Sequence, residues 1–139
     1  MPTNKEYVDL VSQGTFPEEV RVPLDFPFID DRGIIQNLWL GGSGSITHIT
    51  SKKGTNRANH YHQGDFHATY IISGEIKYTE SNIDGTDKKE YAFKKGDMFM
   101  SPPMKWHRME FLSDSEFITI NGIVKSHDNY ERSVVRIER

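Results

Sequence analysis

From residue 21 onward the chain alternates between short apolar runs and turn residues. Runs rich in Ile, Val, Thr, Tyr and Phe recur every eight to fifteen positions, and turn-forming residues separate them. This spacing is typical of the short antiparallel strands of a sandwich or barrel. The pattern predicts strands over residues 34–40, 45–50, 59–62, 67–73, 75–80, 89–93, 98–101, 107–111, 116–122 and 133–137.

The N-terminal segment has a different pattern. Tyr7, Val8, Leu10 and Val11 can form one apolar face of a short helix, and the glycine and proline that follow end it. We therefore expect an all-β body with a short N-terminal helical arm.

Length and charge limit the classes of protein that fit. The 139 residues match one domain, so residues 1–139 are predicted to form a single domain. A net charge of −3 provides no basic surface, so no nucleic acid and no membrane is expected as a partner. No apolar run approaches the roughly 18 residues that span a bilayer, and no signal-like N-terminus is visible, so we expect a cytoplasmic protein.

Four of the six histidines carry the chemistry that stands out. His60 and His62 point to the same side of a strand, because side chains alternate along it. His67 follows an interruption at Gly64, and His107 follows two prolines. Each histidine alone is explained by ordinary hydrogen bonds, but the set together indicates a shared metal ion. With no cysteine in the chain, nitrogen and oxygen are the available ligands.

The spacing of these residues resembles the two motifs of the cupin family. The first motif is matched by Gly54, His60, His62, His67 and Gly74, with His67 at the place of the family's acidic ligand. The second is matched by Gly96, Pro102 and His107, whereas Met104 and Phe111 replace its glycine and asparagine. The resemblance covers about residues 54–111.

The resemblance implies a jelly-roll barrel, the double-stranded β-helix, with His60, His62, His67 and His107 as metal ligands. His67 in place of a carboxylate makes the ligand set neutral. This favours one divalent transition metal, iron, nickel or zinc, over manganese. Cupin relatives usually dimerise through sheet edges, so we expect a homodimer, with residues 134–137 as a candidate edge.

Two segments also resemble the sugar-nucleotide cupins, the deoxysugar 3,5-epimerases and 3,4-ketoisomerases. The segments are residues 28–33 and residues 57–62. Those isomerases work without a metal, so the complete set of histidines here is a departure. The resemblance implies a small-molecule substrate of the sugar or sugar-nucleotide type.

Other residues are predicted around the metal. His48 and Glu110 are candidate catalytic bases, although a hydrogen-bonded structural role is the favoured explanation of His48. Candidate substrate-binding residues are Arg57, Thr69, Met100, Lys105 and Trp106. Arg57 is a rim residue able to bind a carboxylate or phosphate, and the apolar side chains also serve as core. His127 lies in a polar run and is predicted to be an exposed turn residue.

Three functions fit these features. The leading hypothesis is a metal-dependent isomerase or epimerase that acts on a small polar carbonyl compound. An iron-dependent dioxygenase is the competing enzyme, since imidazoles with an open coordination position also suit oxygen chemistry. A non-catalytic cupin that binds a small ligand is the third.

Overall fold

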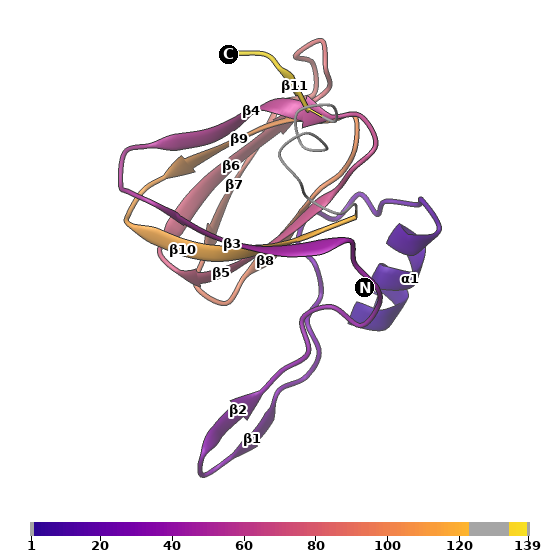
Figure 1. Cartoon of the computed structure of the whole chain (residues 1–139), viewed down its shortest axis with the longest axis vertical. Coiled ribbons are helices and arrows are strands. Elements are labelled where there is room, and N and C mark those ends of the chain that lie inside the picture. Colours follow the sequence, from indigo (N-terminus) through magenta and orange to yellow (C-terminus); the bar gives the residue numbers. More distant parts are fainter. Residues whose placement is uncertain (1, 123–133, 139) are drawn as a thin grey trace.

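The computed structural model describes residues 2–122 and 134–138, and it is mostly β (Figure 1). Two sheets form the body. The five-stranded sheet has the order β11-β4-β9-β6-β7, and the four-stranded sheet has the order β3-β10-β5-β8. Their strands are β3 (Ser45–Ser51), β4 (Asn56–His62), β5 (His67–Ser73), β6 (Glu75–Ser81), β7 (Lys89–Lys94), β8 (Met98–Ser101), β9 (Trp106–Phe111), β10 (Ser115–Asn121) and β11 (Val134–Arg136).

The main core lies between the inner faces of these two sheets. Ile76 and Phe111 come from the five-stranded sheet, whereas Ile71 and Phe117 come from the four-stranded sheet, and all four belong to one buried cluster. Aromatic rings fill much of the space, including Phe93 and Phe99, whose ring centroids are 4.7 Å apart. The alternation of the strands therefore places one apolar face of each sheet against the other.

The predicted N-terminal helix is confirmed as α1 (Asn4–Ser12). Thr3 and Glu6 form a capping box at its start, which satisfies backbone N–H groups that lack helical partners. Tyr7 and Val11 on its buried face pack in one cluster with Met98 and Met100 of β8. The helix and the segment after it thus cover the outer face of the four-stranded sheet, which explains why β8 is buried on both sides.

The predicted strand over residues 34–40 is wrong in extent. Regular pairing is limited to β2 (Gly33–Ile35), which forms a hairpin with a strand that was not predicted, β1 (Phe28–Asp30). The hairpin projects from the body in Figure 1. Its apolar side chains are exposed on both faces, so no alternation of polar and apolar residues marks it in the sequence.

The strand β4 contains a bulge where it pairs with β9. The register shifts between Ala58 and His60, and Ala58 and Asn59 have φ values of 78° and 56°. A bulge inserts one extra residue, which changes the side on which the preceding side chains lie. Arg57 is therefore the Cα partner of Met109, while His60 is the partner of His107, so both face the inside.

The ends of the chain limit two other predictions. The predicted strand over residues 133–137 corresponds to β11, with residue 133 outside the described residues. His127 also lies outside them. Across residues 2–122 and 134–138, no helix has the length and apolar character needed to cross a membrane.

Candidate metal centre

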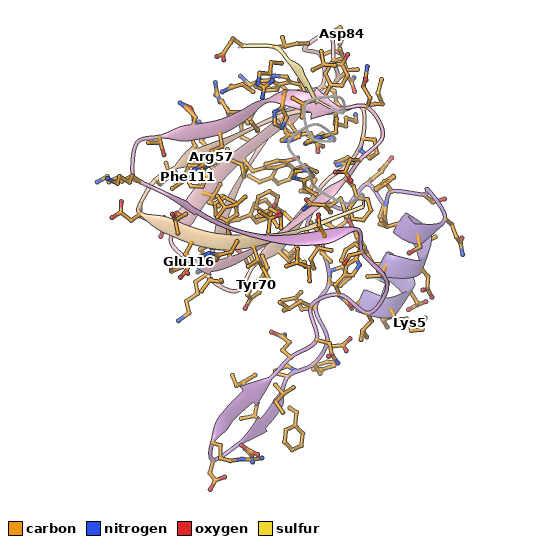
Figure 2. All side chains as sticks on the ribbon, in the orientation of Figure 1. Lys5, Arg57, Tyr70, Asp84, Phe111 and Glu116 are labelled. Atoms are coloured by element: carbon orange, nitrogen blue, oxygen red, sulfur yellow. The ribbon has the colours of Figure 1, made fainter. Side chains whose placement is uncertain are left out.

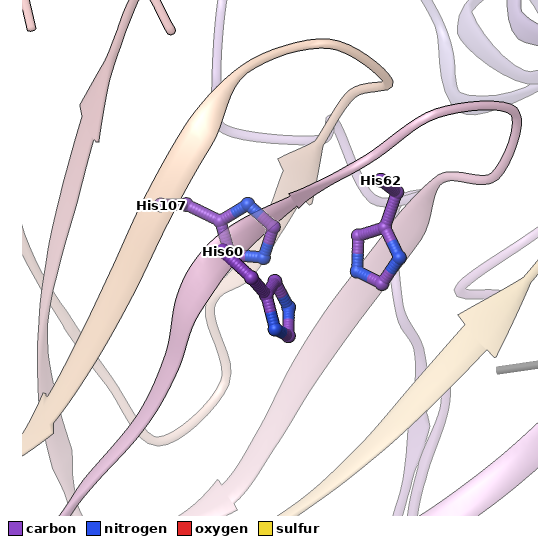
Figure 3. Close-up of side chains that lie close together, drawn as sticks. All are labelled: His60, His62 and His107. Atoms are coloured by element: carbon purple, nitrogen blue, oxygen red, sulfur yellow. The ribbon is translucent and has the colours of Figure 1, made fainter. Parts of the chain in front are cut away.

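Three histidines of the five-stranded sheet converge on its inner face. His60 and His62 come from β4, and His107 comes from β9 as the direct Cα partner of His60 (Figure 3). One ring nitrogen from each residue lies within 4.8 Å of those of the other two. All three side chains are buried. Their arrangement offers three nitrogen donors to a single ion.

His67 reaches the same region from the opposite sheet. It begins β5, and its ring centroid is 4.2 Å from that of His62. With His62 and Asp65 it forms a second group whose ligand atoms lie within 4.8 Å of one another. The fourth predicted ligand is thus adjacent to the three-histidine group, with His62 shared between both groups.

Asp65 is a site residue that the sequence did not reveal. Its Oδ1 accepts hydrogen bonds from the backbone N–H groups of Phe66 at 2.9 Å and Gly122 at 2.8 Å. Its Oδ2 lies 3.6 Å from Nε2 of His67. In the sequence, Gly64 and Asp65 are typical of a turn, so their pairing alone gave no sign of this role.

The hydrogen-bonding environment suits metal-binding imidazoles. Metal-bound histidines usually donate their second N–H to a carboxylate or a backbone carbonyl. Nδ1 of His107 lies 3.2 Å from the carbonyl oxygen of Lys105, which directs Nε2 toward the other rings, and Asp65 stands beside Nε2 of His67. Burial, followed by the charges of His60 and His67, holds the pKa of His107 well below its usual value. The neutral imidazole that a metal binds is therefore favoured, and the donor set fits a late first-row divalent ion.

A cavity of about 430 Å³ adjoins these histidines. Its lining includes the predicted residues Arg57 and Thr69 together with His60, His67 and His107. Arg57 donates from Nε to the hydroxyl of Ser51 and from Nη2 to the carbonyl of Thr50 at 2.9 Å. Two lining residues that were not predicted are Ser101 and Arg136.

The structure places both candidate bases outside this cavity. His48 is paired with Ile118, whereas its neighbours Thr47 and Ile49 pair with the inward residues Thr119 and Phe117. Its Nε2 lies 2.6 Å from Glu116, which Figure 2 shows on the outer side of the four-stranded sheet. The roles assigned to His48 and Glu110 are corrected accordingly, because strand parity turns both away from the histidines.

Glu110 lies on the outer face of the five-stranded sheet. It alternates with the inward-facing pair of His107 and Met109, and its carboxylate lies 3.7 Å from Lys77 and 3.3 Å from Arg108. These contacts are the ordinary ion pairs of a sheet surface.

Three predicted substrate contacts also take other positions. Met100 pairs with Ala68 on the face opposite His67 and packs in the cluster beneath α1. Trp106 is buried on the outer face of the five-stranded sheet and donates from Nε1 to the carbonyl of Ile137 at 2.6 Å. Lys105 points to Asn82, with Nζ 2.6 Å from Oδ1. These residues support the fold around the histidines and do not line the cavity.

Two facing sheets with histidines gathered at an internal cavity define a class of small β proteins built around a ligand site. The Cupin domain family matches residues 47–121, more than half of the chain. The chain therefore belongs to the cupin family. A comparison with curated protein sequences gives no match.

Solved structures with the same fold include enzymes of sugar nucleotides. The sugar 3,4-ketoisomerase QdtA from Thermoanaerobacterium thermosaccharolyticum, in complex with TDP, has a TM-score of 0.65 at 14% identity over 80% of this chain and 82% of that chain. The dTDP-4-dehydrorhamnose 3,5-epimerase from Sulfolobus tokodaii has a TM-score of 0.61 at 17% identity, with coverages of 74% and 69%.

The capsular polysaccharide assembling protein CapF from Staphylococcus aureus has a TM-score of 0.63 at 19% identity over 89% of this chain. Only 37% of CapF is covered, so the chain spans little more than a third of that protein. At these identities, the likeness to all three proteins shows the fold alone.

Proposed function

We propose that this chain is a metal-dependent cupin enzyme that isomerises or epimerises a small polar carbonyl compound. The proposal includes one jelly-roll domain over residues 1–139 and a cytoplasmic location. His60, His62 and His107 hold one divalent ion, with His67 as the fourth ligand. The observation that carries the proposal is the convergence of the three buried histidines, of which His60 and His107 line a cavity that also contains Arg57.

The ligand set determines what the ion contributes. A divalent ion bound by neutral imidazoles keeps its full charge and supplies Lewis-acid polarisation of a substrate oxygen. Iron, nickel and zinc suit nitrogen donors better than manganese does. Asp65, which lies behind His67, orients the imidazole ring that binds the ion, while its Oδ1 stays bonded to the backbone.

The cavity residues provide substrate binding. Arg57 is held by Ser51 and Thr50, so its guanidinium is oriented before a substrate enters. Thr69 and Ser101 offer hydroxyl groups from the opposite wall.

Deuterium exchange tests the isomerase reaction. The metal-loaded protein is incubated in heavy water with keto-deoxysugar nucleotides and with small keto compounds, and the products are analysed by mass spectrometry. An isomerase that passes through an enolised substrate incorporates deuterium next to the carbonyl. The absence of deuterium uptake from every substrate, with metal confirmed in the protein, would reject the isomerase function.

An iron-dependent dioxygenase is the second candidate, and one observation favours it. Among the described residues, the lining of the cavity contains no aspartate or glutamate, and neither His48 nor Glu110 reaches it. Oxygen chemistry requires an open coordination position on the metal, but it does not need a carboxylate base. Oxygen consumption by the iron(II)-loaded protein with diketones, thiols and phenols distinguishes this function. Ligand binding without turnover under any metal would instead identify a non-catalytic binding protein.

A further inference from the structure

The cavity beside the histidines has an uneven charge. Its lining contains two arginines, Arg57 and Arg136, and among the described residues it contains no carboxylate. The histidine donors are neutral when they bind metal, so they add no negative charge to the cavity. Both arginines are exposed at the edge of the cavity, where their positive charges attract an anion. The charge of this cavity therefore favours an anionic ligand.

Arg57 lies close to the histidines along the same face. Its Cα partner is Met109, which is two residues along β9 from His107, the partner of His60. Two residues of a strand span about 7 Å. A ligand atom at the histidines and a carboxylate at Arg57 are thus separated by only a few bonds, as in a small organic acid.

The guanidinium of Arg57 is held in place by its neighbours. Its Nε and Nη2 donate to Ser51 and Thr50 of β3. Nη1, the third guanidinium nitrogen, makes no hydrogen bond with the described residues and is left to bind a ligand. A planar, fixed guanidinium binds a carboxylate with strong geometric preference.

Arg136 approaches from the other side of His60. It belongs to β11 and is the direct Cα partner of His60, just as His107 is on the opposite flank. Cross-strand partners project to the same face, and Arg136 accordingly lines the cavity. His60 is therefore flanked by a histidine on β9 and by an arginine on β11.

The dimensions and surroundings of the cavity restrict the size of the anion. Its volume of 430 Å³ is at the low end of the roughly 300–1,000 Å³ of ligand pockets. A larger groove shares Arg57 and Asn56 with it, but besides Lys52 that groove also carries Asp114 and Glu116. A diphosphate extending along the groove would meet these two carboxylates, whereas a small acid stays within the cavity.

We propose that the substrate is a small organic acid whose carboxylate is bound by Arg57 and Arg136, with a carbonyl or hydroxyl oxygen next to it directed at the histidines. This class includes 2-oxo and 2-hydroxy acids. The inference rests on the metal centre of the proposed function and names the substrate class of the same cavity. It departs from a sugar nucleotide, in which the anionic group is a diphosphate.

Calorimetric titration tests the substrate class with oxalate, pyruvate and TDP as probes. Each is titrated into the zinc-loaded protein and into the metal-free protein. We expect oxalate and pyruvate to bind more tightly than TDP, and Arg57→Gln to weaken oxalate binding at least tenfold. Arg57→Lys keeps the charge but loses the planar fork, and should retain part of the affinity. Arg32→Gln, in the β1–β2 hairpin outside the cavity, is the control and should bind oxalate like the parent protein.

The outcomes separate this inference from the metal centre. Metal content and melting temperature of each variant show whether it is folded. Tighter binding of TDP than of oxalate, or equal oxalate binding by parent and Arg57→Gln, would overturn the substrate class even if the protein holds metal. A parent protein that holds no metal would instead overturn the proposed function. In that case, Arg57-dependent oxalate binding by the metal-free protein would still support the anion site.

Discussion

The imidazole rings of His62 and His67 lie 4.2 Å apart although their strands belong to different sheets. His62 ends β4 of the five-stranded sheet, and His67 begins β5 of the four-stranded sheet. An ion bound to both rings would connect the two sheets. A ligand that binds only the folded state stabilises it by mass action, so stability should follow metal content.

Loss of a buried ligand should remove the metal. We expect His62→Ala and His107→Ala each to lose the ion during purification, because the remaining donors form a much weaker chelate. Each variant should melt several degrees below the parent when metal is present. Elemental analysis of untagged protein, together with thermal melting, measures both effects.

His48→Ala is the matched control for these variants. His48 is exposed on the outer face of the four-stranded sheet and pairs with Glu116. Its loss should leave the metal content unchanged. Equal metal content in all three variants would contradict the assignment of the ligands.

Replacing His67 by glutamate should change the preference for metals. A carboxylate adds a negative charge and an oxygen donor, so His67→Glu should raise the affinity for manganese relative to zinc. Competition titrations with both ions measure this ratio. An unchanged ratio would show that His67 does not bind the ion.

Gly74 should be sensitive to any side chain. It connects β5 to β6 with a φ of 98°, a conformation that other residues rarely adopt, and a Cβ there would lie 2.7 Å from the carbonyl oxygen of Asp114. Gly74→Ala should lower the free energy of unfolding by about 1–3 kcal/mol, since the strain and the close contact both act on the folded state. Urea unfolding measures the change.

Gly42→Ala provides the comparison for that substitution. A Cβ at Gly42 meets nothing within 4 Å, and its φ lies outside the left-handed region. Its unfolding free energy should stay within about 0.5 kcal/mol of the parent value. A similar decrease in the unfolding free energy of both variants would mean that the strain and close contact at Gly74 are not the cause of the decrease.

The β1–β2 hairpin should form the contact of the expected homodimer. Phe28 and Ile34 are 62% and 66% exposed, and a lone two-stranded hairpin is marginally stable in water. Phe28→Lys combined with Ile34→Lys should shift the mass measured by light scattering from dimer to monomer. Leu112→Lys, in the loop after β9, should leave the mass unchanged. If Val135→Lys instead disrupts the dimer, the dimer contact lies at the β11 edge.

The sequence predicted the strands well where turn residues bracket them. The strands β5 and β8 agree with the predicted ranges, because Gly64 and Gly74 enclose one and two prolines end the other. The same reasoning failed at the hairpin, where Asp30 and Gly33 enclose a tight turn but the flanking side chains face solvent on both sides. A strand without a buried face leaves no periodic pattern.

The side of the sheet on which a residue lies was harder to predict. Parity correctly put His60 and His62 on one face, but it does not say which face is internal, and His48 proved external. Met100 belongs to a strand that is buried on both sides by α1 and the main core, so burial alone did not locate it. The bulge that turns Arg57 inward depends on left-handed conformations at two non-glycine residues, which no sequence signal announces.

The long separation of the donors along the chain has a consequence for folding kinetics. His107 lies 47 positions after His60, yet the two are paired, so a long loop must close before they meet. In the unfolded chain only His60, His62 and His67 are close together in sequence, whereas His107 is distant. Ion binding by the whole set therefore follows strand pairing, and interactions that form late slow unfolding more than they speed folding. For this protein, the bound ion would chiefly slow unfolding of the native state, which would extend the lifetime of the protein against proteolysis.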